Sequence, residues 1–166
     1  MSKQLIGYKA KDIEGYEGRY SVTECGKVYS HSRVDTNGQL HKGRWLKPYE
    51  GGKYTSLRLS KDGIVRTVNV HSLVADAFIP NPDGLYAVNH KDEDKHNPEL
   101  SNLERCTTQY NAEYSLGVTC SFVSPEGYKV TVHNLAAFCR TEGLDPSNIS
   151  KIRTGKLKHH KGWKLF

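Results

Sequence analysis

The hydrophobic period of this chain changes at residue 70, and this change limits the folds open to it. Residues 56–60 alternate between apolar and polar side chains, with Leu57 and Leu59 on one face and Ser56, Arg58 and Ser60 on the other, as expected for a strand with one buried face. Asp62-Gly63 interrupts the alternation and is a strong hairpin signal, because a type I′ turn needs positive φ at both central positions. Over residues 70–78 the apolar side chains recur at helical spacing instead. The sequence therefore predicts short antiparallel strands followed at once by a short amphipathic helix.

The residues after this helix predict a compact unit of strand, loop, strand and helix. Strands are expected at 86–90 and 102–106, with the polar loop 91–101 between them. Thr107 is a candidate N-cap for a helix over 108–115. This order of elements is a ββα unit.

Residues 117–166 begin with an expected linker at Gly117. The elements expected after it are a hairpin over 121–132, helices over 134–143 and 146–155, and a closing strand over 162–166. Gly143 can end the first helix in a left-handed conformation, Asp145 can cap the second, and Pro146 suits its first turn. Two short helices across such a turn are a helix-turn-helix candidate.

The net charge of +6 is distributed unevenly. Residues 1–69 carry +6, residues 70–116 carry −5 and residues 117–166 carry +5. Basic flanks suit a polyanion, and an acidic centre is common in nucleases, where a divalent cation sits between protein oxygens and a phosphate. A solvated acidic loop between basic modules would give the same pattern. We expect an α+β chain divided at these boundaries.

Composition excludes several classes of protein. Hydrophobic residues make up 36% and charged residues 25%, too apolar for a disordered chain and too polar for a membrane protein. The opening residues have no apolar h-region, which argues against secretion. The four cysteines lie far apart and form no CxxC pair, which argues against a disulfide framework and a structural zinc site. We therefore expect reduced thiols in a cytoplasm.

The sequence VNH at 88–90, with Asn102 and Asn111 downstream, is the best candidate for chemistry. In a ββα unit, a histidine and an adjacent oxygen ligand on one strand can face a second oxygen ligand on the following helix. Oxygen ligands can hold Mg²⁺ or Mn²⁺ against a scissile phosphate. An imidazole, with a pKa of roughly 6.5, can take a proton from the attacking water.

The stretch VHSLVADAFIPNPDGLYAVNHKDEDKHNPELSNLERCTTQYN resembles the HNH motif of phage and intron-encoded homing endonucleases. The opening IEGYEGRYSVTECGKVYS resembles the DNA-binding element that precedes this nuclease, and residues 124–166 resemble the helix-turn-helix module that follows it. The resemblance covers nearly the whole chain, in the family's order. It implies an N-terminal antiparallel β DNA-binding module (1–69), a ββα-metal nuclease core (70–116) and a C-terminal helix-turn-helix DNA-binding module (117–166).

The resemblance also assigns roles within the motif. His90 would be the general base, and Asn89 and Asn111 would hold one Mg²⁺ or Mn²⁺ ion through their carbonyl oxygens. Asn102 would clamp the loop so that His90 is oriented correctly, which counts it with the catalytic residues. Three departures stand out: Asn89 where many relatives have Asp, Asp92-Glu93-Asp94 where Asp-Gly-Asn is usual, and Arg105 where an aromatic is usual.

DNA contact is expected from polar and basic residues outside the motif. Arg58 lies on the expected strand face opposite Leu57 and Leu59. The C-terminal candidates are Ser147, Asn148, Ser150, Lys151, Arg153, Lys156 and Lys158. A polar helix face without DNA contact is the alternative for that group. His71, at the start of the central helix, is expected to pack or cap rather than bind a ligand.

The sequence as a whole predicts a metal-dependent endonuclease that acts on double-stranded DNA. One ββα copy in a monomer would cut one strand per binding event, so nicking is expected, with no protein partner and no membrane. The family resemblance places it in a bacterial host cell, encoded by a phage. A DNA-binding repressor with an inactive HNH core is the first alternative, kept open by Asn89 and Glu93. An RNA-binding or RNA-cleaving module is the second, although no RNP or KH signature is present.

Overall fold

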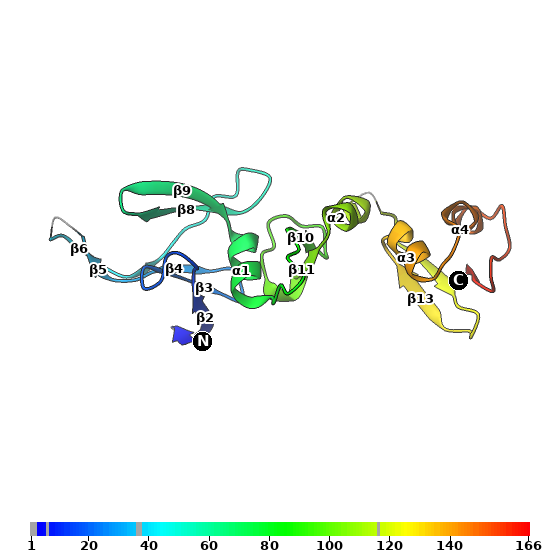
Figure 1. The fold of residues 1–166 in the computed structure, drawn as a ribbon, viewed down its shortest axis with the longest axis horizontal. Helices are drawn as coiled ribbons and strands as arrows, with labels where there is room; N and C mark the ends of the chain where they lie inside the picture. Colours follow the sequence, from blue (N-terminus) through cyan, green and yellow to red (C-terminus); the bar gives the residue numbers. More distant parts are fainter. Residues whose placement is uncertain (1–2, 6, 36–37, 116) are drawn as a thin grey trace. The chain divides into compact units, whose positions relative to one another are not determined.

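A computed structural model describes residues 3–5, 7–35, 38–115 and 117–166 of the chain. It contains two compact units, Met1–Cys106 and Thr107–Phe166. Within the described residues all strand pairs are antiparallel, and helices and strands alternate irregularly along the chain (Figure 1). The predicted α+β class is confirmed at this level. The three-part functional division at residues 69/70 and 116/117 remains a prediction.

The N-terminal strands of the first unit form a twisted antiparallel sheet and two hairpins. The sheet has the order β1-β2-β3-β4-β7, with β1 Lys3–Leu5, β2 Tyr8–Asp12, β3 Tyr20–Thr23, β4 Val28–Ser30 and β7 Arg44–Trp45. The hairpins pair β5 Arg33–Val34 with β6 Leu40–His41, and β8 Ser56–Lys61 with β9 Ile64–Asn69. This region is as rich in short strands as the sequence predicts.

The β8–β9 hairpin turns at the predicted dipeptide. Asp62 has φ 51° and Gly63 has φ 77°, the two positive values that a type I′ turn needs. Leu57 and Leu59 are buried on one face, whereas Arg58 between them is exposed. Both the hairpin and the alternation of its first strand are confirmed.

Helix α1, Val70–Phe78, follows β9 directly and organises the core of the first unit. Val70 and Val74 are fully buried and belong to the same apolar cluster as Val22 and Val28 of the sheet. The helix contacts β2 and β3 on one side and β10 and β11 on the other (Figure 1). The core therefore includes residues from both sides of position 69/70.

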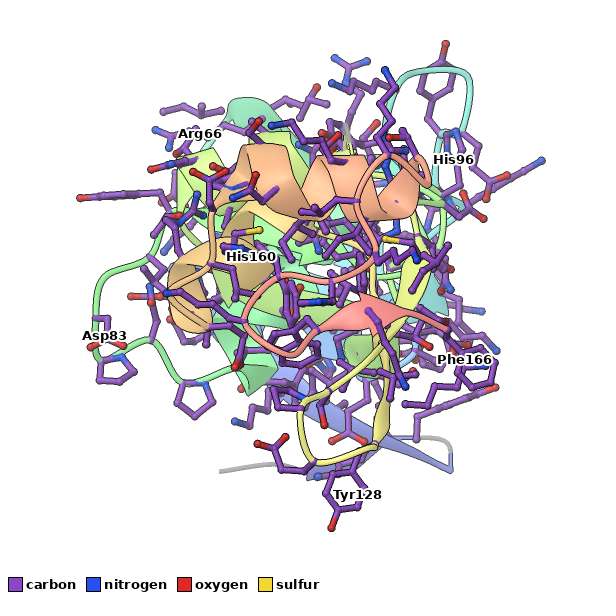
Figure 2. The ribbon with its side chains drawn as sticks, turned by 90° about the vertical axis from the view of Figure 1, so that its right-hand side faces the viewer. Arg66, Asp83, His96, Tyr128, His160 and Phe166 are labelled. Atoms are coloured by element: carbon purple, nitrogen blue, oxygen red, sulfur yellow. The ribbon has the colours of Figure 1, made fainter. Side chains whose placement is uncertain are left out.

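The two strands of the predicted ββα unit are β10, Ala87–His90, and β11, Leu103–Cys106. They pair so that Asn89 faces Glu104 and His90 faces Leu103. A short 3₁₀ turn, η1 Leu100–Asn102, leads into β11. Between α1 and β10 a proline-containing loop projects from the unit, with Asp83 pointing outward (Figure 2).

The second unit begins with α2, Thr108–Ser115, the helix of the predicted ββα order. Thr107 Oγ1 accepts the backbone N–H of Tyr110 at 3.0 Å, so the predicted N-cap is confirmed. A three-stranded sheet follows in the order β13-β12-β14, from β12 Cys120–Val123, β13 Lys129–Val132 and β14 Lys164–Leu165. Tyr128, at the β12–β13 turn, points away from the sheet (Figure 2).

Helices α3, Leu135–Thr141, and α4, Pro146–Arg153, cover this sheet with a core of Phe122, Ile149 and Trp163. Their junction has the predicted chemistry. Gly143 has φ 60°, and Asp145 Oδ1 accepts the backbone N–H of Asn148 at 2.9 Å with Pro146 in the first turn. The helix pair is as expected, whereas its function as a DNA-binding helix-turn-helix remains a prediction. None of the described helices is long and apolar enough to cross a bilayer.

Candidate active site

The centre of the candidate site is the end of strand β10. Asn89 is fully buried and His90 is 1% exposed, which is unusual for polar residues at the end of a short strand. Buried polar groups normally have hydrogen-bond partners, so those without partners require an explanation. In the described part of the chain, such unpartnered buried atoms include Oδ1 of Asn89 and both ring nitrogens of His90.

Glu104 fixes the orientation of the Asn89 amide. Asn89 Nδ2 donates to Glu104 Oε1 at 2.8 Å across the β10–β11 pair. Because an ionised carboxylate only accepts hydrogen bonds, the amide nitrogen must face Glu104. The carbonyl oxygen of Asn89 is therefore turned away from Glu104, and it is left available for a cation or a donor.

The His90 ring lies in an aromatic cluster rather than a hydrogen-bonded one. Its centroid is 4.8 Å from that of His71 and 6.0 Å from that of Tyr54, which is stacked on it. Burial lowers the pKa of His90, and the positive charge of Lys95 lowers it further, against the opposing effect of Asp92. The imidazole is therefore neutral near neutral pH and can accept a proton.

Two members of this cluster, Tyr54 and His71, were not expected there from the sequence. His71 is buried in the first turn of α1, with its ring 4.7 Å from that of Tyr54. Burial, and then the nearby His90, lowers the pKa of His71 to about 4. Packing was the expected role, and His71 does pack. The spacing of His71 three residues before the buried Val74 was a signal that it faces inward.

Asn102 joins the ends of the polar loop after β10. Its Oδ1 accepts the backbone N–H of Asp92 at 3.0 Å, and its Nδ2 donates to Asp92 Oδ1 at 2.8 Å and to the Asn97 carbonyl at 3.0 Å. Burial would raise the pKa of Asp92, but hydrogen bonds from Asn97 and Asn102 hold it below its usual value. The residue directly after His90, Lys91, donates its N–H to the Asn102 carbonyl at 2.9 Å.

The structure accommodates two of the departures from the family pattern in specific ways. Glu93 has φ 64°, the left-handed conformation that the usual glycine adopts without strain and that costs another residue about 1–2 kcal/mol. Arg105 is largely buried and pairs with Asp76 of α1 at 2.6 Å, while also donating to the Leu85 carbonyl at 3.3 Å. The loop therefore keeps its turn, and Arg105 ties β11 to α1.

Asn111 lies on α2, in the second unit. Its Oδ1 is buried without a hydrogen-bond partner among the described residues, as is that of Asn89. No group of three or more histidine, cysteine, aspartate or glutamate side chains that could hold a metal occurs in the described ranges. Amide oxygens are hard ligands, and Mg²⁺ needs only one or two protein oxygens because it keeps several waters. The unpartnered oxygen of Asn89 and that of Asn111 are each, taken singly, of the kind that binds such a cation.

The residues predicted to contact DNA lie on two surfaces. Arg58 is exposed on β8, where it lines a cavity of about 650 Å³ together with Arg44, Lys47 and Trp45. On and after α4, the exposed candidates are Ser147, Lys151, Arg153, Lys156 and Lys158, whereas Asn148 and Ser150 are half-buried. The Nδ2 of Asn148 is 3.5 Å from the ring of His160, which reduces its availability to a ligand.

Comparison with known proteins identifies one matching motif and several similar proteins. Residues 11–71 match the NUMOD4 motif. The DNA endonuclease I-HmuI of Bacillus phage SP01 is 30% identical, with 92% of this chain and 94% of that protein covered. The uncharacterized HNH endonuclease L245 of Acanthamoeba polyphaga mimivirus is 26% identical over 84% of this chain and 42% of its own length.

A solved structure, titled "DNA binding and cleavage by the HNH homing endonuclease I-HmuI", is also similar. It is 27% identical, with 93% of this chain and 95% of that chain covered and a TM-score of 0.46. The family resemblance that the motifs predicted is confirmed by the sequence identity to the phage enzyme over nearly the full length of both chains. The chain therefore belongs to the family of HNH homing endonucleases.

Proposed function

We propose that this protein is a metal-dependent endonuclease that hydrolyses phosphodiester bonds of double-stranded DNA and nicks one strand. The observation that carries the proposal is the buried, unpartnered imidazole of His90 beside the equally unpartnered Oδ1 of Asn89. A protein that only binds DNA gains nothing from burying these groups unsatisfied, because each costs about 1–3 kcal/mol. Membership of a nuclease family supports the same conclusion.

His90 is the proposed general base. Its neutral ring takes a proton from the water that attacks the phosphorus atom, and one of its two unpartnered nitrogens is the acceptor. Tyr54 and His71 pack against the ring and limit its rotation. Asn102 is the proposed positioning residue, because it holds the backbone on both sides of the loop that follows His90.

Asn89 and Asn111 are the proposed ligands of one Mg²⁺ or Mn²⁺ ion. A bound cation of this kind polarises the phosphate and stabilises the departing oxygen. Glu104 contributes indirectly, since it holds the Asn89 amide with the oxygen turned away from the carboxylate. The amide carries no formal charge, so we expect weaker metal binding than a carboxylate would give.

DNA is the proposed substrate, held by surfaces on both units. Arg58 and the exposed residues of α4 and the segment after it contact phosphates and base edges. The protein works as a monomer in this proposal, and a single ββα copy then cuts one strand per binding event.

The absence of a carboxylate at position 89 favours one alternative, a DNA-binding repressor with an inactive core. Supercoiled plasmid incubated with Mg²⁺ or Mn²⁺ separates the two functions. The proposal predicts open circles with the unmodified protein and with His41→Ala, an exposed histidine that bonds to Asp35, as a control. It predicts none with EDTA or with His90→Ala. Supercoils that persist while DNA is bound would establish the repressor, and cleavage of RNA in preference to duplex DNA would establish a ribonuclease.

A further inference from the structure

Helix α2 carries Asn111 but has no buried residue of its own. Most helices in proteins are fixed by packing a buried apolar face. The tyrosines of this helix are only half-buried, and the Tyr114 ring lies 4.2 Å from that of His133. Something else must therefore hold the helix in a defined position if Asn111 is to present its oxygen to a cation.

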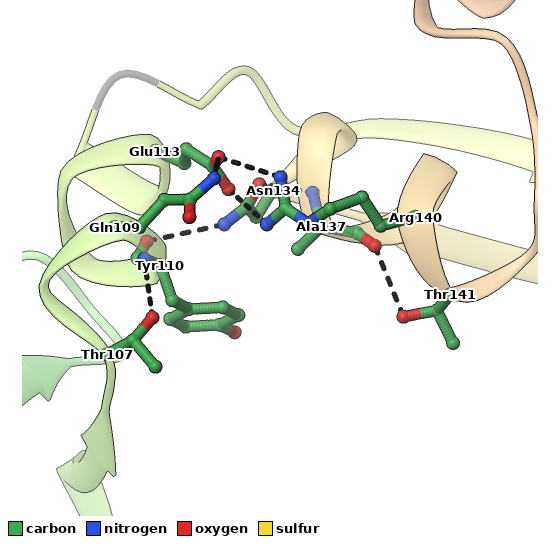
Figure 3. Close-up of polar contacts among 8 residues, drawn as sticks. All are labelled: Thr107, Gln109, Tyr110, Glu113, Asn134, Ala137, Arg140 and Thr141. Atoms are coloured by element: carbon green, nitrogen blue, oxygen red, sulfur yellow. Dashed lines mark hydrogen bonds and ion pairs between the residues drawn. The ribbon is translucent and has the colours of Figure 1, made fainter. Parts of the chain in front are cut away.

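Besides that ring contact, polar contacts from the segment after β13 and from α3 hold the helix (Figure 3). Arg140 of α3 makes a bidentate pair with Glu113, with Nη1 to Oε1 at 2.8 Å and Nη2 to Oε2 at 2.6 Å. Gln109 donates to the same carboxylate at 2.9 Å. The Asn134 amide donates to the Tyr110 carbonyl at 3.4 Å. Bidentate pairing of this kind fixes orientation as well as distance.

The pair is strong enough to change the ionisation of Glu113. Its hydrogen bonds with Arg140, and then with Gln109, lower the pKa of Glu113 to about 2. The same contact raises the pKa of Arg140. Both side chains are therefore charged at every pH at which the protein is expected to work.

Glu113 lies on the side of α2 that faces away from Asn111. Two residues along a helix correspond to a rotation of about 200°. Arg140 therefore contacts the side of α2 that bears Glu113, and Asn111 projects from the opposite side of the helix. A change in the Glu113–Arg140 contact would turn or shift the helix and move the oxygen of Asn111 with it.

We propose that Arg140 and Glu113 are positioning residues for Asn111, the α2 side chain that is a proposed ligand of the cation. The inference rests on the proposed function, in which Asn111 is a ligand. This role differs from that of a unit that only strengthens DNA binding, because variants of such a unit would alter only the dissociation constant for DNA. Here the helix that bears a ligand depends on a side chain of α3.

Manganese binding tests the inference without relying on cleavage. Free Mn²⁺ is measured by electron paramagnetic resonance in titrations of the full chain bound to a duplex, with His90→Ala in every protein to prevent hydrolysis. We expect Arg140→Met to weaken Mn²⁺ binding by about tenfold or more, while the affinity for DNA changes by less than about twofold. The double variant Glu113→Arg with Arg140→Glu restores most of the Mn²⁺ affinity. Lys129→Met, which removes one charge from the exposed end of β13, leaves Mn²⁺ binding unchanged.

Three results would overturn the inference. Unchanged Mn²⁺ affinity in Arg140→Met would show that the pair does not position Asn111. A loss of DNA affinity with unchanged Mn²⁺ affinity would show that Arg140 binds DNA. If the double variant Glu113→Arg with Arg140→Glu did not restore Mn²⁺ affinity, the pair would have no positioning role. If Arg140→Met unfolds the second unit, Glu113→Gln takes its place and must show the same loss. Absence of Mn²⁺ binding in the parent His90→Ala protein would instead refute the proposed function itself.

Discussion

At the scale of single residues, the site depends on which atoms are left without partners. Asn89 uses its nitrogen for Glu104, so that only its oxygen remains. His90 uses neither nitrogen within the described residues. The sequence could identify both residues, because VNH matches a known motif. It could not identify Glu104 or Tyr54, since their contacts depend on strand register and on packing across the unit.

The contact with Glu104 predicts that the usual carboxylate will not simply improve this site. Asn89→Asp places a buried carboxylate against the half-buried carboxylate of Glu104 and should lower the free energy of unfolding by about 1–3 kcal/mol. Adding Glu104→Gln restores a donor opposite the new Asp. We expect the double variant to bind Mn²⁺ about tenfold more tightly than the unmodified protein, because its ligand is charged.

Urea denaturation and the Mn²⁺ concentration for half-maximal nicking measure these two effects. Glu104→Gln alone is the matched control, and it should change metal binding less than the double variant does. Equal stability and tighter metal binding in Asn89→Asp alone would contradict the proposed role of Glu104.

The lowered pKa of His90 predicts the dependence of cleavage on pH. A general base acts when it is unprotonated, so the rate rises with pH until the pKa is passed. Because burial lowers this pKa from its usual 6.5, the single-turnover rate should level off below that value and stay flat through neutral pH. Rates that continue to rise tenfold per pH unit above about 7.5 would identify a different base.

At the scale of secondary-structure elements, local signals predicted most of the fold. The β8–β9 turn, α1, the order of β10, β11 and α2, and the junction between α3 and α4 follow from turn residues, periodicity and caps. The attachment of α2 could not be predicted. It depends on a contact between Glu113 and Arg140, which are 27 residues apart, and no local pattern in the sequence pairs them.

The Glu113–Arg140 pair also predicts a specific loss of stability in acid. A carboxyl whose pKa is lowered by folding stabilises the protein above its unfolded value of 4.5, and this contribution disappears as the pH falls through about 2. Arg140→Met should therefore lower the melting temperature of the full chain at pH 5–7. The difference should shrink steadily as the pH is lowered below 4.5. A difference that is the same at pH 2.5 as at pH 6 would mean that packing, not charge, explains the effect.

At the scale of the whole molecule, charge is distributed unevenly between the parts of the chain. The segment 117–166 carries +5, and its exposed cations cluster on and after α4. The segment 70–116 carries −5, which suits a cation site better than direct contact with phosphates. These roles remain predictions from charge. Charge counting could not place α2, because the helix belongs to the acidic segment in sequence and to the second unit in space.

If the cations near α4 contact phosphates, they determine how salt weakens DNA binding. Each contact contributes about 0.9 to the slope of log affinity against log salt concentration. Replacing Lys151, Lys156 and Lys158 together by Gln should reduce that slope by about 2–3. Lys129→Gln, on the β12–β13 hairpin, serves as the control and should leave it unchanged. Binding isotherms over a range of salt concentrations measure the slope, and an unchanged slope in the triple variant would remove these lysines from the DNA contact.

Chemical rescue of a missing base tests the central claim most directly. His90→Gly removes the imidazole and leaves a cavity lined by Tyr54 and His71. Nicking of supercoiled plasmid by this variant should be about 10²–10⁴-fold slower, and added imidazole should restore part of the rate in proportion to its neutral fraction. Nicking at the unmodified rate without imidazole would contradict the assignment of His90 as the general base.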